Sequence, residues 1–180
     1  MITSSMPTAG GRLLTLGWSD GTTFLPAAGS LLSSEQASNH LQPVDTRIDK
    51  RTVGYRRRRE SWQKAPDVVL QLLAEGQAAG LKARYVLFDS WFSTPRLLRQ
   101  IVAERQLHVV AMVKAMKTIR YTCDGKRYTL KALYTHLKKR PGKARILATA
   151  SALLETQNGS HPVRWSSFGI VVGDRKRGSL

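Results

Sequence analysis

YVLFDSWFSTP, at residues 85–95, is the segment of this sequence from which the fold can be worked out. Its first four residues are apolar or aromatic without interruption, which predicts a fully buried strand. Asp89 follows at the end of that strand, and Thr94 and Pro95 supply the N-cap and the first position of a helix. Open α/β sheets hold reactive groups at the carboxyl ends of their strands, so Asp89 is a candidate reactive residue. A strand-end aspartate is also common as a cap or turn residue, and that second interpretation stays open.

The segments on either side of this strand predict a parallel sheet covered by helices. Apolar residues at helical spacing predict helices over residues 66–79 and 95–105. A continuous apolar run predicts another strand over residues 107–113, parallel to the first through a right-handed crossover. Lys114 follows this strand and is therefore expected at the same sheet edge as Asp89. It is either a lysine that contacts phosphate or one more basic residue on the surface.

The N-terminal part of the chain predicts an antiparallel hairpin. Residues 12–18 and 23–32 have strand patterns, and the Asp-Gly pair that begins at Asp20 predicts the turn between them. Asp20 is favoured as a turn residue over a second catalytic acid. Pro26 indicates an edge position or a bulge in the returning strand. Residues 1–10 show no pattern and are expected to be unstructured.

The residue pattern changes in the C-terminal third of the chain, where strand and turn patterns predict a mainly β subdomain. Asp124 and the glycine after it predict a hairpin turn between residues 118–122 and 127–130. A short helix is expected over residues 130–139. Two further strands are then expected, over residues 145–154 and 163–172.

The charge of the chain indicates a polyanionic partner. Twenty-nine Lys and Arg residues oppose twelve Asp and Glu residues, which gives a formal net charge of +17. One cysteine and four histidines exclude a disulfide framework and a multi-cysteine zinc site, and they suit a reducing cytoplasm. No apolar run approaches the length of a membrane span, and the N-terminus lacks the pattern of a signal peptide.

The most basic window is DKRTVGYRRRRESWQK, at residues 49–64. Arginine, lysine, tyrosine and tryptophan alternate in it, which suits phosphate contacts combined with stacking on bases or sugars. The alternative is a solvated basic helix or loop without a partner. The candidate nucleic-acid contacts, with the lysine at the sheet edge included, are Lys50, Arg51, Tyr55, Arg56, Arg57, Arg58, Arg59 and Lys114.

Three segments together resemble one family. RLLTLGWSDGTTFLP to SLLSS at residues 12–34, DKRTVGYRRRRESWQKA at residues 49–65 and YVLFDSWFS at residues 85–93 occur in the order and spacing of bacterial insertion-sequence transposases. VVAMVK at residues 109–114 also fits. The resemblance is to DDE transposases of the insertion-sequence-4-like group, and it covers about residues 12–175. It implies an α/β fold: a partial RNase H-like core, with a mixed sheet and helices, plus an inserted mainly β subdomain.

The domains expected from this resemblance are a disordered N-terminus at residues 1–11, a partial core at residues 12–117, a β-rich insertion at residues 118–175 and a tail at residues 176–180.

The resemblance also implies a role for the strand-end acid. In this family the aspartate of the DSWFS-like segment is the second member of an Asp-Asp-Glu triad, so Asp89 is the expected catalytic residue and ligand of Mg²⁺ or Mn²⁺. The first aspartate is expected upstream of residues 12–18 and the glutamate downstream of the β-rich insertion. Neither has a candidate, because Asp20, Asp124 and Glu155 occur in turn or insertion segments. The sequence therefore predicts an internal fragment of a transposase, inactive alone.

The functions that follow from these observations fall into three classes. The leading one is part of a metal-dependent DNA nicking and strand-transfer enzyme, with transposon ends and target DNA as partners. The alternative is a non-enzymatic basic DNA-binding protein that regulates a full-length transposase, and a gene remnant without function also fits. The expected location is the bacterial cytoplasm, with the nucleoid, and no membrane partner is expected.

Overall fold

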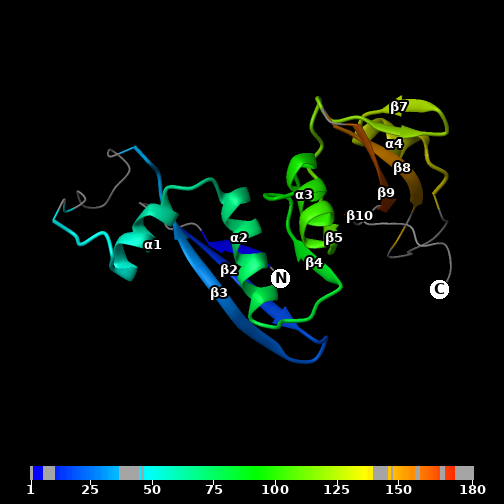
Figure 1. Cartoon of the computed structure of the whole chain (residues 1–180). Helices are drawn as coiled ribbons and strands as arrows, with labels where there is room; N and C mark the ends of the chain where they lie inside the picture. Colours follow the sequence, from blue (N-terminus) through cyan, green and yellow to red (C-terminus); the bar gives the residue numbers. More distant parts are fainter. Residues whose placement is uncertain are drawn as a thin grey trace. The chain divides into compact units, whose positions relative to one another are not determined.

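A computed structural model of the chain describes residues 2–5, 11–36, 45, 47–139, 146, 148–156, 159–166 and 169–172, the first and last of these ranges by their backbone only. Predictions that fall on other residues, including parts of the strands expected over residues 145–154 and 163–172 and the C-terminal tail, lie outside the described part. The chain divides into two compact units, Met1–Lys82 and Ala83–Leu180 (Figure 1). The elements mix helices and strands in both units, which confirms the predicted α/β class.

The first unit is built on an antiparallel sheet in the order β3-β2-β1. Its strands are β1 (Ile2–Ser5), β2 (Arg12–Ser19) and β3 (Phe24–Leu32). β1 corrects the expectation that residues 1–10 are unstructured, because Ile2 pairs with Leu16 and Ser5 with Leu13. A four-residue polar strand has no detectable periodicity. It is held by backbone hydrogen bonds along the free edge of β2, which sequence pattern does not show.

The hairpin between β2 and β3 confirms the predicted turn. Asp20 Oδ1 accepts the backbone N–H groups of Thr22 and Thr23, at 2.9 and 2.7 Å. These two hydrogen bonds, that of Thr23 first, hold the pKa of the Asp20 carboxyl below its usual value. Pro26 pairs with Gly17 next to a β-bulge, on a strand at the edge of the unit's sheet, so both of its predicted settings are met.

Two helices complete the first unit, α1 (Val53–Ser61) and α2 (Ala65–Ala78). The apolar stripe of α2 is buried and packs against β2 and β3 (Figure 1). The contact is close at Gly76, where an added Cβ would lie 3.1 Å from Leu16 Cδ2. α1 is joined to the end of β3 by a backbone hydrogen bond, in which the N–H of Ser33 donates to the carbonyl of Ser61 at 2.7 Å. The apolar core of this unit thus lies between α2 and the sheet, whereas α1 buries Glu60 and contacts β3.

The second unit begins with β4 (Tyr85–Phe88), α3 (Pro95–Arg105) and β5 (His108–Ala111). β4 and β5 are parallel, as predicted. Thr94 caps α3 by accepting the N–H of Leu97, and Pro95 opens the helix. The expectation that β4 is fully buried is wrong. Its inward residues are buried, but Tyr85 and Leu87 remain 49% and 47% exposed, because an unbroken apolar run does not reveal whether both faces of a strand are covered.

The rest of the second unit extends the same sheet, in the order β4-β5-β10-β9-β8-β6-β7. Its elements are β6 (Tyr121–Cys123), β7 (Lys126–Tyr128), α4 (Leu130–His136), β8 (Thr149–Thr156), β9 (Gly159–Ser166) and β10 (Gly169–Val172).

One expectation for this region needs correction. The strand expected over residues 163–172 is two strands, β9 and β10, because the connection between them lacks the Asn-Gly or Asp-Gly pair that marks the other hairpins. β10 also pairs antiparallel with β5, so the β-rich region continues the sheet of β4 and β5. The predicted domain boundary after residue 117 therefore falls inside the second compact unit. None of the helices in the described part of the chain has the length and apolar character that a membrane span requires.

Candidate functional site

Asp89 stands at the carboxyl end of β4, in the tight turn that leads to α3. Its Oδ1 atom accepts the backbone N–H of Trp91 at 2.9 Å, and its side chain is half-buried. The same turn is held by the buried hydroxyl of Ser93, which donates to the carbonyl of Ser90 at 3.0 Å. Asp89 therefore does have the turn role that the sequence left open. Among the described residues none bonds to its second carboxylate oxygen, which stays available to a ligand.

Lys114 and Trp91 meet beside this acid. β5 runs parallel to β4, so the residues that follow the two strands reach one sheet edge. The Nζ atom of Lys114 lies 4.1 Å from the centroid of the Trp91 ring, and Trp91 is 53% exposed. The next residue, Phe92, is buried and meets Phe88 edge to face, which anchors the turn. Asp89 and Lys114 therefore both follow strands that end at one sheet edge, and the exposed ring of Trp91 contacts Lys114 there.

Trp91 was missed as a site residue by sequence reasoning. The signal that could have found it is its place two residues after a strand-end acid, next to a buried phenylalanine, in a segment otherwise explained by packing. An exposed tryptophan in such a turn contributes little to the core and offers a flat surface on which a base or a sugar stacks.

The residues at this edge do not fit a two-metal-ion centre. Such a centre needs several carboxylates that converge on Mg²⁺ or Mn²⁺. In the described ranges no three side chains of the His, Cys, Asp or Glu type come together where they could hold an ion. Asp89 supplies one hard oxygen donor, which is suitable chemistry for one ligand and insufficient for the full set.

The other acids considered from the sequence have structural roles. Asp20 caps the β2–β3 hairpin, and Asp124 occupies the β6–β7 turn with a φ of 51°. Glu155 accepts hydrogen bonds from the guanidinium of Arg127 and, at 2.6 Å, from the hydroxyl of Thr122. Those two partners, Arg127 first, lower the pKa of the Glu155 carboxyl. These contacts agree with the turn and insertion roles predicted for the three acids.

The first part of the basic window builds the start of α1. Asp49 Oδ1 accepts the backbone N–H of Arg51 at 2.9 Å and also contacts its guanidinium at 3.4 Å. Thr52 is the N-cap: its hydroxyl donates to the Asp49 carbonyl at 2.7 Å and accepts the N–H of Tyr55 at 3.2 Å. Lys50 and Arg51 are exposed in this cap. The Asp-Lys-Arg-Thr sequence therefore caps the start of α1, and its two cations, Lys50 and Arg51, are exposed to solvent.

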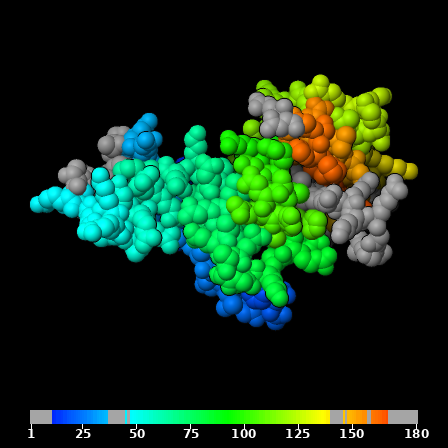
Figure 2. Space-filling view, in the orientation of Figure 1, coloured from blue at the N-terminus to red at the C-terminus, as the bar shows by residue number. Residues whose placement is uncertain are grey.

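The four consecutive arginines of α1 do not behave alike. Successive helical residues point about 100° apart, so four in a row spread around the helix. Arg57 is bound to Glu60 at 2.8 Å, and the Glu60 side chain is only 8% exposed. This hydrogen bond raises the pKa of Arg57 and marks it as a structural partner of a buried acid. The three that are exposed and make no ion pair with any residue in the described part are Arg56, Arg58 and Arg59. Figure 2 shows α1, in cyan, at the surface.

The candidate site residues thus fall into two sets, and one of them includes Trp91, which the sequence did not predict. The α1 set belongs to the unit Met1–Lys82, and the set formed by Asp89, Trp91 and Lys114 belongs to the unit Ala83–Leu180. Each set combines at least one exposed cation with an aromatic side chain. Tyr55 is half-buried on α1, and Trp91 is exposed at the sheet edge. Each is suited to contact a phosphate backbone.

Comparison with known proteins bears on what these two sets serve. A family model described as DDE superfamily endonuclease matches residues 3–165. No curated protein and no solved structure matches the chain. The mixed α/β fold is consistent with a partial RNase H-like DDE nuclease, and the family supports a transposase-like nuclease function that acts on DNA, in a family that generally uses divalent metals. Because the match spans most of the sequence, this chain belongs to the DDE superfamily of endonucleases.

Proposed function

We propose that this chain is part of a bacterial transposase of the insertion-sequence-4-like group, and that by itself it binds DNA without cutting it. The observation that carries the proposal is the pairing of Lys114 with Trp91 beside Asp89, at the edge where parallel strands end. The net charge of +17 supports a polyanionic partner for this edge and for α1.

Each set of residues has a distinct part in the proposed contact. Arg56, Arg58 and Arg59 on α1 contact phosphates, with Lys50 and Arg51 at its cap beside them and Tyr55 available for stacking. Arg57 holds Glu60 and contributes charge to the same surface.

At the sheet edge, Lys114 leaves the face of Trp91 for a phosphate. That exchange costs little, because an exposed cation–π contact is worth about 0.5–1 kcal/mol. Trp91 is then free to stack on a base or sugar of the same strand. The DNA backbone would thereby be brought next to Asp89.

Asp89 is the proposed catalytic and metal-binding residue of the complete family site. A divalent ion, Mg²⁺ or Mn²⁺, would supply Lewis-acid chemistry at a phosphodiester. The described residues do not fit the full ligand set, so no step through the metal is derived. Asp89 positions the turn through Trp91 and keeps one carboxylate oxygen open toward the DNA.

The experiment that tests the proposal measures DNA binding and cleavage by the same purified protein. Binding of a labelled duplex should weaken steeply as salt rises, because several phosphates are neutralised. Nicking of supercoiled plasmid in Mg²⁺ or Mn²⁺ should stay at the level of the buffer control. Absence of salt-sensitive DNA binding would overturn the proposal. Metal-dependent nicking that persists in Asp89→Ala would overturn the role of Asp89.

A second candidate is a non-enzymatic DNA-binding protein that regulates a full-length transposase by occupying its DNA or its partner surface. It is favoured because no three His, Cys, Asp or Glu side chains of the described residues come together where they could hold a metal ion. Competition separates the two: a regulator lowers strand transfer by the complete enzyme at protein concentrations that occupy the transposon ends. Both candidates imply a location with the bacterial nucleoid in the cytoplasm.

A further inference from the structure

The antiparallel sheet of the first unit has one face that α2 does not cover. α2 packs on the other face, where Leu14 and Leu16 are buried (Figure 1). The strand positions that point away from α2, here called the outward face, are Leu13, Thr15, Gly17 and Ser19 on β2 and Phe24, Pro26, Gly29 and Leu31 on β3. Three large apolar side chains of this face remain about half exposed: Leu13 at 46%, Phe24 at 55% and Leu31 at 62%.

Glycine residues keep the outward face low. A Cβ added to Gly17 would lie 2.2 Å from Phe24 Cζ, and one added to Gly11 would lie 3.3 Å from Leu31 Cδ1. The two large side chains therefore lie along the sheet, over glycine positions, and do not stand away from it. A low apolar surface of this kind fits against the face of another sheet.

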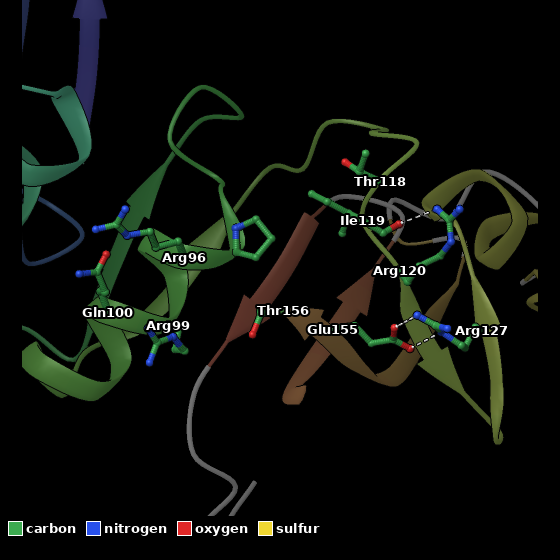
Figure 3. A pocket seen from close by; sticks show the side chains of 10 residues that line it. Arg96, Arg99, Gln100, Thr118, Ile119, Arg120, Arg127, Glu155 and Thr156 are labelled. Atoms are coloured by element: carbon green, nitrogen blue, oxygen red, sulfur yellow. Dashed lines mark hydrogen bonds and ion pairs between the residues drawn. The ribbon is translucent and has the colours of Figure 1, made fainter. Parts of the chain in front are cut away.

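The outward face carries no charge, since none of its positions on β2 and β3 is a charged residue. Other surfaces of the chain differ. Figure 3 shows a hollow of the second unit that is lined by charged side chains, among them Arg99, Arg127 and Glu155. An antiparallel sheet with one solvated face normally has polar residues on that face. In a chain with a net charge of +17, an uncharged apolar face offers nothing to a polyanion and indicates an apolar partner surface.

Opposite charges stand at the two ends of the outward face. Arg12 begins β2, is exposed and forms no ion pair with any residue that the structure describes. Asp20 directly follows β2 and is also exposed, and the backbone N–H groups of Thr23 and Thr22 hold the pKa of its carboxyl below the usual value. Two copies stacked about a two-fold axis can run parallel, which brings like charges together. They can also run antiparallel, which places Arg12 of one copy over Asp20 of the other.

We propose that the outward face is the docking surface for a second copy of this chain, stacked antiparallel about a two-fold axis that crosses β2 near Thr15. Leu13, Phe24 and Leu31 of the two copies form the apolar contact, and Arg12 pairs with Asp20 at both ends. This interaction goes beyond DNA binding and does not depend on it.

The size of the outward face sets the strength of the dimer. With strands about 4.8 Å apart and a rise of about 3.4 Å per residue, a three-stranded sheet of this length presents roughly 400 Å² per copy. Two such faces bury about 800 Å² together, below the roughly 1,200 Å² at which stable interfaces begin. The charge of +17 on each copy adds a repulsion that salt screens. The dimer should therefore form at about 0.1 mM protein and strengthen as salt rises, whereas DNA binding weakens with salt.

The first test measures self-association of the whole chain by sedimentation equilibrium, from about 10 µM to about 0.5 mM protein in about 0.3 M NaCl. L13S/L31S removes two apolar side chains from the outward face, and the control I146S/L153S removes two that are each 42% exposed in the second unit. The dissociation constant should rise about tenfold or more in L13S/L31S and stay unchanged in the control. A monomer at every concentration of the unsubstituted protein, or equal effects of the two variants, would overturn the inference.

The second test is cross-linking, which keeps the apolar contact intact. Thr15→Cys places a thiol near the proposed two-fold axis, and Leu153→Cys places one at an exposed position of the second unit. Cys123 is buried and adds little background. Stacked sheets lie about 10 Å apart, too far for a disulfide, so a short bismaleimide is the reagent. Cross-linked dimer should accumulate with T15C and remain at the unsubstituted level with L153C. Equal yields from these two variants would count against the outward face and overturn the inference.

The third test reverses one end charge. R12E should weaken the dimer about three- to tenfold, because it places like charges over each other. R12E/D20N should recover part of that loss, since asparagine keeps an oxygen for the N–H groups of Thr22 and Thr23. Self-association of R12E equal to that of the unsubstituted protein would overturn the antiparallel arrangement. A dimer that binds no DNA would contradict the proposed function alone, and a strictly monomeric protein that binds DNA would contradict this inference alone.

Discussion

The ammonium group of Lys114 lies 4.1 Å from the centroid of the Trp91 ring, and the two residues follow the parallel strands β5 and β4. The contact brings a positive charge and a stacking surface to the edge where Asp89 stands. It also connects a sequence feature, the strand-end acid, with a partner that lies 25 residues further along the chain in the printed sequence. The first prediction follows from this pair.

Lys114→Ala should weaken binding of DNA about three- to tenfold, as expected for the loss of one phosphate contact and its counterion release. It should also alter the fluorescence of Trp91, because the charge over the indole is lost. Fluorescence anisotropy with labelled duplex, together with tryptophan emission in Trp91→Phe as the reference, measures both effects. Lys131→Ala, an exposed lysine on α4, is the control. Affinity equal to that control would contradict a phosphate contact by Lys114.

Asp89→Asn and Asp89→Ala should have different effects on stability and similar effects on DNA affinity. Asparagine keeps an oxygen that accepts the Trp91 N–H, whereas alanine loses that hydrogen bond at a cost of about 0.5–1.5 kcal/mol. Either change removes a negative charge near the DNA, so affinity should stay the same or rise slightly. Thermal unfolding and binding isotherms check the two effects. A large fall in affinity with Asp89→Asn would contradict this prediction, because it would show that the charged carboxylate of Asp89 supports DNA binding.

Addition of Mg²⁺ should raise the melting temperature of the chain equally in the unsubstituted protein and in Asp89→Asn. The reason is that a ligand stabilises the folded state only when its concentration exceeds its dissociation constant, and one carboxylate forms a weak site that adds little to the general effect of the ion. Differential scanning fluorimetry with Mg²⁺, and with Ca²⁺ for comparison, measures this. A shift specific to Mg²⁺ that disappears in Asp89→Asn would reveal further ligands at this edge.

Arg57→Ala should destabilise the first unit, while Arg56→Ala should not. Glu60 is buried on α1, its Oε2 depends on Arg57, and its Oε1 has no hydrogen-bond partner among the described groups. Removal of Arg57 would leave a buried carboxylate unpaired, at a cost of about 1–3 kcal/mol. Urea unfolding of the two single variants provides the comparison. A double variant, Arg57→Ala with Glu60→Leu, should recover most of the loss, since an apolar residue avoids the unpaired charge.

Acid should weaken the contribution of the Arg127–Glu155 pair. The folded-state pKa of Glu155 is depressed by Arg127 and Thr122, so the folded state binds the proton less readily than the unfolded one. The stabilisation is therefore fully present above the usual glutamate pKa of about 4.3 and is lost as pH falls through the lower folded value. Arg127→Ala should lower the melting temperature near neutral pH, and the difference from the unsubstituted protein should shrink in acid. A difference that is constant with pH would exclude this linkage.

Local sequence was sufficient to predict the elements that carry the candidate site. The strand at β4, the acid at its end, the Thr94 cap and the Pro95 start of α3 all depend on residues within a few positions of one another. The hairpin turn at Asp20 was likewise predicted, because the turn preference is intrinsic to the residue type. The parallel pairing of β4 with β5 also followed, since a helix between two strands is the usual connection of a parallel pair.

Tertiary structure alone decided the features that depend on distant partners. β1 forms because its backbone pairs with that of β2, and no side-chain pattern in Ile2–Ser5 predicts this pairing. Arg57 differs from Arg56 because α1 turns Glu60 into the interior, which four consecutive arginines in a sequence do not show. The contact of Lys114 with the Trp91 ring arises from the parallel pairing of β4 with β5. Short-range propensity thus determines which elements form, whereas burial and strand pairing across the chain determine which charges are neutralised and which remain for a ligand.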